Sequence, residues 1–238
     1  MISTNVPQKI WDLMAEKYDD WFKTKYGIKI YREEIKKLRQ VLGKGGGKVL
    51  DVGCGSGLFT IKLVKEKFEV YGLDFSASMV KKAKEKNVEV FVADAHHLPV
   101  KNDFFDVVLF FTTFEFLDEN LALKEALRVL RKDGYVILGV HNWFNPWNVC
   151  RKIKAKIKKK SVYGMVKYYS VLSLKRILKE HLFHITILTS CIFLPFSLKL
   201  DFFLEKIGLK IFGAILIVKA KKREKAKNLI LTSACFNG

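Results

Sequence analysis

Three glycines at alternate positions follow directly from an apolar strand in the segment VLDVGCGSGLFT (residues 49–60). Asp51 stands near the end of this strand, and the glycines are Gly53, Gly55 and Gly57. Glycine adopts positive φ angles without steric cost, so the chain can turn tightly from a strand into a helix. The N-terminus of that helix presents unpaired N–H groups and the positive end of its dipole. The segment therefore predicts a strand–loop–helix unit of an α/β sheet, with a ligand site at the loop.

Short apolar strands alternate with amphipathic helices over residues 1–142. Successive strands joined by helices need crossover connections, so this alternation predicts a parallel sheet with helices on both faces. The continuous apolar run VVLFF (residues 107–111) is typical of a central strand that is buried on both faces. The expected strands are 48–52, 69–74, 88–94, 105–111, 135–141, 184–194 and 211–220, and the expected helices are 8–23, 30–42, 58–67, 77–86, 119–131 and 173–181.

The length and composition fit a single domain. The chain has 238 residues, of which 50% are hydrophobic, and this suffices for one sheet covered on both faces. We expect residues 1–222 to form the domain and residues 223–238 to form a flexible tail. Residues 182–198 carry no Lys, Arg, Asp or Glu, but Pro195 interrupts them. They are therefore expected to form a strand and a loop rather than a membrane span.

The cysteines and histidines do not form the patterns of a metal site. Cys54, Cys150, Cys191 and Cys235 are far apart in the sequence and make no C-x-x-C pair. The histidines at 96–97 have no cysteine or acidic partners at ligand spacing, so we interpret them as ordinary surface or core residues. We therefore expect no metal and no disulfide scaffold, and a reducing, cytoplasmic location.

The positive charge is concentrated in the last part of the chain. The net charge is +19, yet residues 1–142 hold 23 basic and 20 acidic side chains, whereas residues 143–238 hold 20 basic and 4 acidic ones. Seven of the ten residues from Arg151 to Lys160 are basic. On a helix, Ile153 and Ile157 would form an apolar stripe among these lysines, which suits an anionic membrane surface or a nucleic acid. A solvated, lysine-rich helix that covers the site is the alternative interpretation.

Three aspartates stand at the ends of three successive expected strands. They are Asp51, Asp74 and Asp94, and the ends of parallel strands meet at one rim of the sheet, where ligands of such sheets bind. A dinucleotide-binding loop of the form G-x-G-x-x-G would require glycine at position 58, which is Leu58. Three carboxylates would also repel a polyphosphate. The pattern D-x-G-x-G-x-G therefore favours a zwitterionic nucleoside that has no phosphate.

Four sequence blocks in order identify a family that the chain resembles. They are VLDVGCGSG, YGLDFSASMV, FVADAHHLPVKNDFFDVVLF and ALRVLRKDGYVILGV. Over about residues 10–142 the chain resembles the class I S-adenosylmethionine-dependent methyltransferases, especially the small-molecule branch that includes the ubiquinone/menaquinone-type enzymes. The resemblance implies S-adenosylmethionine as cofactor. It also implies a Rossmann-like α/β sheet of seven strands, mostly parallel with the last one antiparallel, and helices on both faces.

The resemblance also divides the domain into four parts. Residues 1–42 would be N-terminal lid helices, and residues 46–142 would be the cofactor-binding core. Residues 143–182 would form a basic insertion or cap, and residues 183–222 would be the C-terminal strands. In the lid, Tyr18 would close over the methionine end of the cofactor, although it could equally belong to the apolar face of an amphipathic helix.

The cofactor-binding residues follow from the same resemblance. Residues 51–57 would cradle the methionine moiety, Asp74 would hold the ribose, and residues 94–95 would read the adenine edge. Phe75 and Met79 would pack on the adenine, but apolar residues at a helix start are equally often core. The full set expected to bind the cofactor is Tyr18, Asp51, Gly53, Cys54, Gly55, Gly57, Asp74, Phe75, Met79, Asp94, Ala95 and Phe111.

No catalytic base is specified by the sequence. Glu115 and His141 follow or end expected strands on the active rim, so either could act as a general base. Polar residues at strand ends are more commonly satisfied by structural hydrogen bonds. Methyl transfer from a sulfonium is an in-line displacement, which positioning and water exclusion can accelerate without any catalytic residue.

Two classes of acceptor remain open at this level. The first is a small acceptor, either apolar or associated with a membrane, which would place the protein at the membrane periphery. The second is RNA (tRNA or rRNA) or protein, bound through the basic C-terminal part. Enzymes that methylate exocyclic amines of bases usually carry [DN]-P-P-[YF] after the fourth strand, where this chain has FFTTFEFL. That difference favours the small acceptor.

Overall fold

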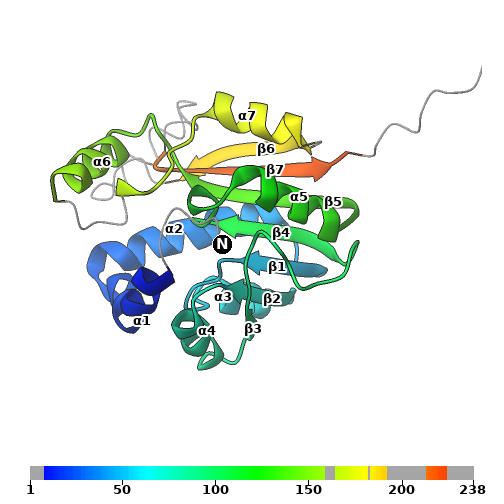
Figure 1. Cartoon of the computed structure of the whole chain (residues 1–238), viewed down its shortest axis with the longest axis horizontal. Helices are drawn as coiled ribbons and strands as arrows, with labels where there is room; N and C mark the ends of the chain where they lie inside the picture. Colours follow the sequence, from blue (N-terminus) through cyan, green and yellow to red (C-terminus); the bar gives the residue numbers. More distant parts are fainter. Residues whose placement is uncertain (1–7, 159–163, 182, 192–212, 224–238) are drawn as a thin grey trace, which may run out of the picture.

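A computed structural model describes residues 8–158, 164–181, 183–191 and 213–223 (Figure 1). These residues form one seven-stranded sheet in the order β3-β2-β1-β4-β5-β7-β6. Neighbouring strands from β3 to β5 pair in parallel, and β7 is antiparallel to both β5 and β6. The strands are β1 (Lys48–Val52), β2 (Glu69–Asp74), β3 (Glu89–Val92), β4 (Phe105–Phe111), β5 (Leu130–His141), β6 (Phe183–Cys191) and β7 (Ile215–Lys222).

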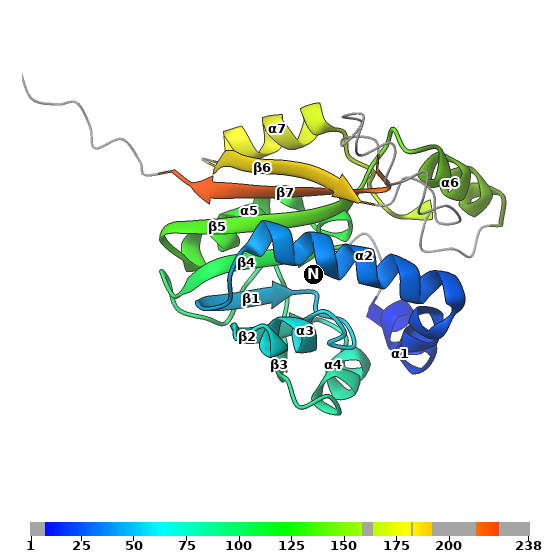
Figure 2. The same cartoon turned by 180° about the vertical axis from the view of Figure 1, so that it is seen from behind.

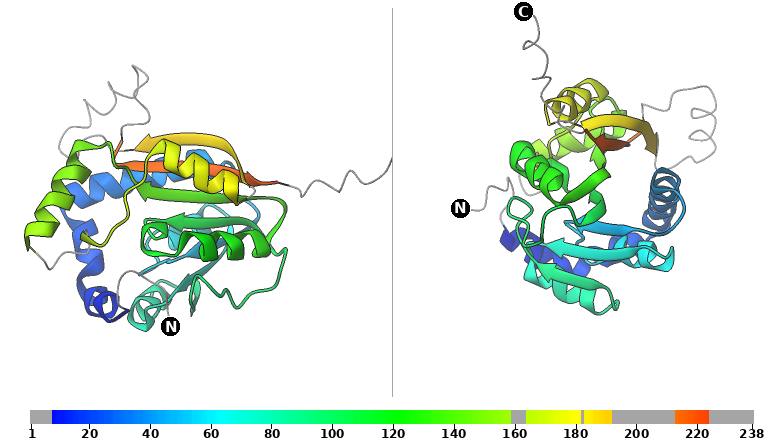
Figure 3. Two further views of the ribbon diagram at one scale, coloured as in Figure 1. Left: turned by 45° about the horizontal axis from the view of Figure 1, so that its top comes forward. Right: turned by 90° about the vertical axis from the view of Figure 1, so that its right-hand side faces the viewer.

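Helices cover both faces of this sheet (Figures 1–3). Apolar residues of α5 and α7 pack on one face, and those of α2 and α3 pack on the other. Along β4, alternate residues enter the two cores: Val108 and Phe110 face α5, whereas Leu109 and Phe111 face α2. The helices are α1 (Gln8–Lys23), α2 (Lys25–Leu42), α3 (Thr60–Lys65), α4 (Ala77–Lys84), the 3₁₀ helix η1 (Phe114–Phe116), α5 (Glu119–Val129), α6 (Pro146–Lys158) and α7 (Val171–Glu180).

The predicted fold class is confirmed: a mostly parallel seven-stranded sheet with its last strand antiparallel and helices on both faces. Two boundaries differ from the expected ones by five residues. The second helix begins at Lys25 rather than at residue 30, because the hydroxyl of Thr24 accepts a hydrogen bond from the Gly27 N–H and caps it. The fifth strand begins at Leu130, directly after α5, rather than at residue 135.

The C-terminal part of the domain agrees with the expected strands where it is described. The apolar segment 182–198 forms β6 over Phe183–Cys191, and the last strand begins at Ile215 rather than at residue 211. Residues 159–163, 182, 192–212 and 224–238 lie outside the described part, and these ranges include the end of the basic run and most of the expected tail. None of the described helices is long and apolar enough to cross a membrane.

The parallel strands all finish at the same end of the molecule. Figures 1 and 2 place α1, the glycine loop after β1 and α6 at this end. The loops that leave the strand ends therefore converge there, and they supply the residues of the site described next.

Candidate functional site

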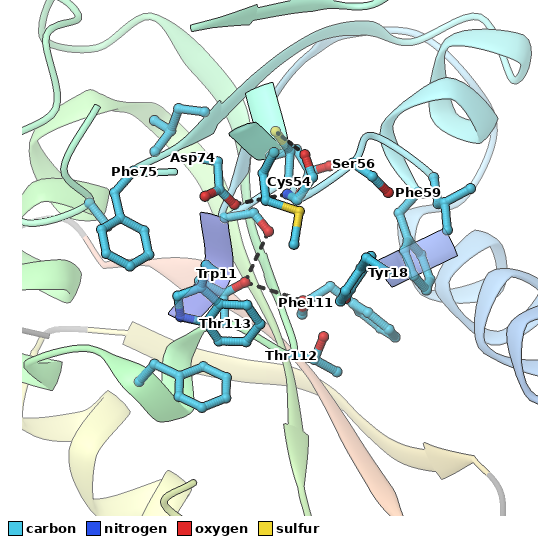
Figure 4. Close-up of a pocket in the computed structure, with 18 of the residues that line it drawn as sticks. Trp11, Tyr18, Cys54, Ser56, Phe59, Asp74, Phe75, Phe111, Thr112 and Thr113 are labelled. Carbon is cyan, nitrogen blue, oxygen red and sulfur yellow. Dashed lines mark hydrogen bonds between the residues drawn. The ribbon is translucent and has the colours of Figure 1, made fainter. Parts of the chain in front are cut away.

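The glycine loop folds back onto the neighbouring strand. The backbone N–H groups of Gly53 and Cys54 both donate to the carbonyl oxygen of Leu73, at 2.7 and 2.9 Å. Gly53 has a φ angle of 73°, and a Cβ atom there would lie 2.2 Å from Cγ2 of Thr113. The Thr113 hydroxyl in turn donates to the Gly53 carbonyl at 3.1 Å. Only glycine fits this position, because the loop is pressed between two strand ends (Figure 4).

Asp51 is held below the loop in a buried position. Its Oδ2 accepts a hydrogen bond of 2.7 Å from the Thr60 hydroxyl at the start of α3. Burial is the largest influence on this carboxyl and raises its pKa to about 6, against the lowering effect of the Thr60 hydrogen bond. The negative charge of Asp74 raises the pKa further. A cation in the pocket would therefore stabilise the ionised form of Asp51.

Asp74 joins the glycine loop to the start of α4. Its Oδ2 accepts from the Gly55 N–H and its Oδ1 accepts from the Ser76 N–H, both at 2.9 Å. Burial raises the pKa of this carboxyl to about 6, and the backbone hydrogen bonds lower it. Each carboxylate oxygen has two lone pairs, so both can still accept a hydrogen bond from a ligand hydroxyl. The side chain lines the pocket opposite Tyr18 (Figure 4).

Asp94 is fixed by the histidine that follows it. Its Oδ1 contacts both the backbone N–H of His96, at 2.9 Å, and the Nδ1 atom of the same residue, at 2.6 Å. The Nε2 atom of His96 accepts a hydrogen bond from the backbone N–H of Asp118 at 3.0 Å. A histidine that accepts at Nε2 carries its proton at Nδ1, so it donates to Asp94. The interpretation of His96 as an ordinary residue therefore missed that it orients a pocket carboxylate.

Helix α1 is tied across the pocket by two of its own carboxylates. Asp12 accepts a hydrogen bond from the Ser76 hydroxyl at 2.5 Å and another from the Ser78 N–H at 3.3 Å. Two turns further along α1, Asp19 accepts a hydrogen bond from the Ser56 hydroxyl. Asp12 and Asp19 therefore connect α1 both to the start of α4 and to the glycine loop. The neighbouring face of α1 contributes Trp11, Tyr18 and Phe22 to the pocket lining.

Several aromatic rings line the pocket or pack behind its lining. Tyr18, Phe22, Tyr31, Phe59 and Phe111 make a continuous series, with ring centroids 4.7–5.7 Å apart. A second contact across the pocket mouth joins the rings of Trp11 and Phe116, whose centroids are 5.1 Å apart in an edge-on arrangement. These rings come from α1, α2, the loop after β1, β4 and η1. They give this part of the pocket an apolar surface.

The space between the lining residues is about 930 Å³, a figure that includes open solvent. None of the described residues that line it is lysine or arginine, although the chain has a net charge of +19. Among the described residues no group of three or more His, Cys, Asp or Glu side chains is placed to hold a metal ion. The lining residues are Trp11, Tyr18, Phe22, Asp51, Gly53, Cys54, Gly55, Ser56, Leu58, Phe59, Leu73, Asp74, Phe75, Met79, Ala93, Asp94, Ala95, Phe111, Thr112, Thr113, Phe116 and Leu117.

All but one of the residues expected to bind the cofactor lie in this lining. The exception is Gly57, where a Cβ atom would lie 3.0 Å from that of Ala83 and 3.2 Å from a methyl group of Val88. Its φ angle is 78°, so it serves the close packing of the loop on α4. Met79 both lines the pocket and is fully buried. The lining residues that the sequence did not indicate are Trp11, Phe22, Leu58, Phe59, Leu73, Ala93, Thr112, Thr113, Phe116 and Leu117.

The two candidate bases do not line the pocket. Glu115 lies in η1 and is completely buried, and its Oε1 is hydrogen-bonded to Nδ1 of His141 at the end of β5. The backbone carbonyl groups of both residues are also hydrogen-bonded. The Lys167 N–H donates to the Glu115 carbonyl, and the Tyr169 N–H donates to the His141 carbonyl. This pair joins the pocket half of the domain to the chain that follows α6, and its contacts are those of a structural link.

The donors and acceptors of the pocket fit a nucleoside that carries a sulfonium centre and an amino-acid group. Asp74 offers two oxygens to a pair of vicinal hydroxyls, and Gly55 leaves open space in which its nearest neighbour would be a ring carbon of Tyr18, 3.8 Å away. The raised pKa values of Asp51 and Asp74 mark carboxylates that a positive charge would stabilise. A phosphate group would find no basic side chain among the described lining residues.

Comparison with known proteins supports the same ligand class. Residues 50–138 match the family model of the methyltransferase domain. An uncharacterised protein of Methanocaldococcus jannaschii is 37% identical over 155 residues, which cover 64% of this chain and 59% of that protein. A demethylmenaquinone methyltransferase of Staphylococcus carnosus is 39% identical over 118 residues, 46% of this chain and 48% of that enzyme. The chain thus spans about half to six tenths of the length of these curated relatives.

Among solved structures, a SAM-dependent methyltransferase of Thermotoga maritima, described as a possible histamine N-methyltransferase, is similar over nearly its whole length. The TM-score is 0.75 and the sequence identity is 25%, over 91% of this chain and 99% of that one. Together with the glycine loop and the three strand-end aspartates, these likenesses support a class I S-adenosylmethionine-dependent methyltransferase.

Proposed function

We propose that the protein transfers a methyl group from S-adenosylmethionine to a small acceptor that is apolar or aromatic. The observation that carries the proposal is the composition of the pocket lining. It combines carboxylates and the glycine loop with aromatic side chains, and the described lining holds no lysine or arginine. Such a lining suits a neutral or cationic acceptor and disfavours an anionic one.

Each carboxylate has a separate task in this proposal. Asp74 accepts hydrogen bonds from the two ribose hydroxyls, while its contact with the Gly55 N–H keeps the loop in place. Asp51 supplies negative charge below the loop, near the amino-acid part of the cofactor. Asp94, held by His96, receives the amino group of the adenine, and Phe75 and Met79 lie against its ring. When bound, the sulfonium supplies an electrophilic methyl group.

In the same proposal, the aromatic side chains position the acceptor and exclude water. The lining includes Tyr18 and Trp11 of α1, Phe116 of η1, and the neighbouring rings of Phe59 and Phe111, whose centroids are 4.7 Å apart. Rings at this place can both stack on an aromatic acceptor and contact a positive sulfonium through their faces. Alignment of the acceptor atom with the methyl group is the main catalytic contribution, since an in-line displacement needs no covalent help from the protein.

A methyl-transfer assay with labelled S-adenosylmethionine tests the proposal. The acceptors compared are a demethylated quinol, a small aromatic amine and bulk tRNA, with the Asp74→Ala variant as a negative control. We expect transfer to one of the small acceptors or to the lipid fraction of a cell extract, and none to tRNA. Transfer to tRNA alone would overturn the proposed acceptor class, and failure of the protein to bind S-adenosylhomocysteine would overturn the cofactor.

A further inference from the structure

Helix α6 presents an apolar row to solvent. Val149, Ile153 and Ile157 are spaced by four residues and therefore lie along one side of the helix, and all three are exposed. The exposed fraction is 54% for Ile153 and 76% for Ile157. Ala155, which lies on roughly the opposite side, is buried against the domain. The apolar stripe expected from the sequence is thus exposed to solvent in the structure.

Two exposed aromatic side chains lie in the chain just before α6. Phe144 is 59% exposed and Trp143 is 46% exposed. The Nζ atom of Lys152 lies over the Trp143 ring, 4.3 Å from its centre, and over the Tyr168 ring, 4.9 Å from its centre. A positive charge therefore accompanies these aromatic side chains. We call the surface formed by Trp143, Phe144, Val149, Ile153 and Ile157 the α6 apolar patch. Five large apolar side chains within fifteen residues indicate an interaction surface.

The charge around this patch is positive. Lys154 is exposed next to Ile153, and seven of the ten residues from 151 to 160 are basic, the last two of them outside the described part. Over residues 143–238 there are 20 basic side chains and only 4 acidic ones. A partner of complementary chemistry would therefore offer an apolar interior below an anionic surface.

We propose that the α6 apolar patch docks on an anionic lipid surface. In this arrangement Ile153, Ile157 and Phe144 enter the boundary between headgroups and acyl chains, and the lysines of α6 contact lipid phosphates. Helix α6 lies at the same end of the domain as α1 and the carboxyl ends of the parallel strands (Figures 1 and 2). Docking would therefore bring the pocket end of the protein to the membrane. This inference holds whichever acceptor the protein methylates.

Two other occupants fit the patch less well. RNA would engage the lysines and the aromatic rings, but Ile153 and Ile157 can neither stack on bases nor contact phosphates. A second copy of the chain would bring two lysine-rich helices face to face, and their like charges would repel. A lipid surface satisfies both the isoleucines and the lysines.

Flotation with lipid vesicles tests this inference on the full-length protein. Vesicles of phosphatidylcholine alone are compared with vesicles that also contain phosphatidylglycerol. The variant Ile153→Ser/Ile157→Ser removes the apolar row without changing the charge, and Leu172→Ser is the matched control, because Leu172 is 77% exposed on α7, away from α6. Phe144→Ser provides an independent second variant. Affinity for S-adenosylhomocysteine shows that each variant is folded.

We expect the wild-type protein to float with the vesicles that contain phosphatidylglycerol, and less with phosphatidylcholine alone. The double serine variant should lose vesicle partitioning by about tenfold or more, because two isoleucine side chains no longer leave water. The control Leu172→Ser should float like the wild type. Equal flotation of the double serine variant would overturn the inference. Isoleucine-dependent dimerisation, or binding to tRNA without binding to vesicles, would overturn it as well.

Discussion

The pocket half of the domain and its C-terminal part differ in how they use charge. In residues 8–142 the carboxylates Asp51, Asp74 and Asp94 are turned inward around one pocket, and each is held by hydrogen bonds to the protein. In α6 the basic residues accompany apolar side chains that face outward. The first arrangement suits a cationic ligand of fixed shape. The second suits an anionic surface that has no fixed shape.

The two regions are therefore expected to respond differently to substitution. In the pocket half, a small change of shape or charge should alter cofactor affinity or stability, because backbone and side chains there are closely interlocked. On α6, exposed side chains should tolerate substitution with little effect on either property. The following predictions test this difference, from the largest expected effect to the smallest.

Replacing Gly53 should destabilise the protein more than replacing Gly55. In Gly53→Ala the new methyl group would overlap Thr113, at 2.2 Å from its Cγ2, in a backbone with a φ angle of 73°. We expect a loss of about 3 kcal/mol or more in the free energy of unfolding. Gly55→Ala meets only a contact of 3.8 Å with Tyr18, so the unfavourable φ angle alone should cost about 1–2 kcal/mol. Urea unfolding measures both; equal losses would contradict the described loop.

Removing His141 should affect stability but not cofactor binding. The substitution His141→Ala leaves the buried Glu115 carboxylate without its hydrogen-bond partner, which should cost about 1–3 kcal/mol. Because neither residue lines the pocket, the affinity for S-adenosylhomocysteine should remain that of the wild type. Calorimetric titration and thermal melting separate the two effects. A large loss of affinity with an unchanged melting temperature would place His141 in the site after all.

Cofactor affinity should fall as the pH is lowered through about 6. Burial raises the pKa of Asp51 and Asp74 to about 6. In the proposed complex, ionised Asp74 would accept hydrogen bonds from the ribose hydroxyls, and ionised Asp51 would supply negative charge near the amino-acid part of the cofactor. Lowering the pH from about 7 to about 5 should weaken binding by about tenfold for each of the two groups. The stability of the ligand-free protein should depend on pH in the opposite direction. The folded protein takes up protons between the ordinary pKa of 3.8 and about 6, so its stability should rise as the pH falls through this window.

Releasing α1 should weaken cofactor binding only modestly. Asp12→Ala/Asp19→Ala removes the hydrogen bonds from Ser76 and Ser56 that hold the helix over the pocket. We expect S-adenosylhomocysteine to bind about threefold to tenfold more weakly, mainly through faster dissociation. Glu16→Ala is the matched control, because it removes an exposed acid from the same helix. An unchanged dissociation rate in the double variant would show that α1 does not close the site.

Most of the pocket could be predicted from the sequence because its backbone is fixed by local pattern. The strand end, the glycines and the aspartates at 51, 74 and 94 follow from strand–helix alternation, and parallel strands bring their ends together. The family resemblance implies that Gly57 contacts the ligand, but Gly57 is not among the lining residues of the pocket. Its positive φ angle serves packing on Ala83 and Val88, which a linear pattern does not distinguish from ligand contact.

What the sequence could not provide depends on contacts between distant segments. The hydrogen bond from Ser76 to Asp12 joins residues 64 positions apart, and no local pattern marks either one. The role of His96 requires knowledge of both Asp94 and the N-terminus of α5. Likewise, the periodicity of α6 predicts an apolar side but not whether it faces the domain or solvent. The structure shows that orientation, because Ala155 is buried and Ile153 and Ile157 are exposed to solvent.

The central claim is that the strand-end carboxylates bind an adenosyl sulfonium. Calorimetric titration of S-adenosylmethionine into wild-type protein and into Asp74→Ala tests it most directly, with Asp20→Ala as a control that removes an exposed acid of α1. We predict saturable binding to the wild type and to the control. Binding to Asp74→Ala should be weaker by about 100-fold, since two charge-assisted hydrogen bonds are lost. Equal affinity in all three proteins, or no binding to the wild type, would contradict the account.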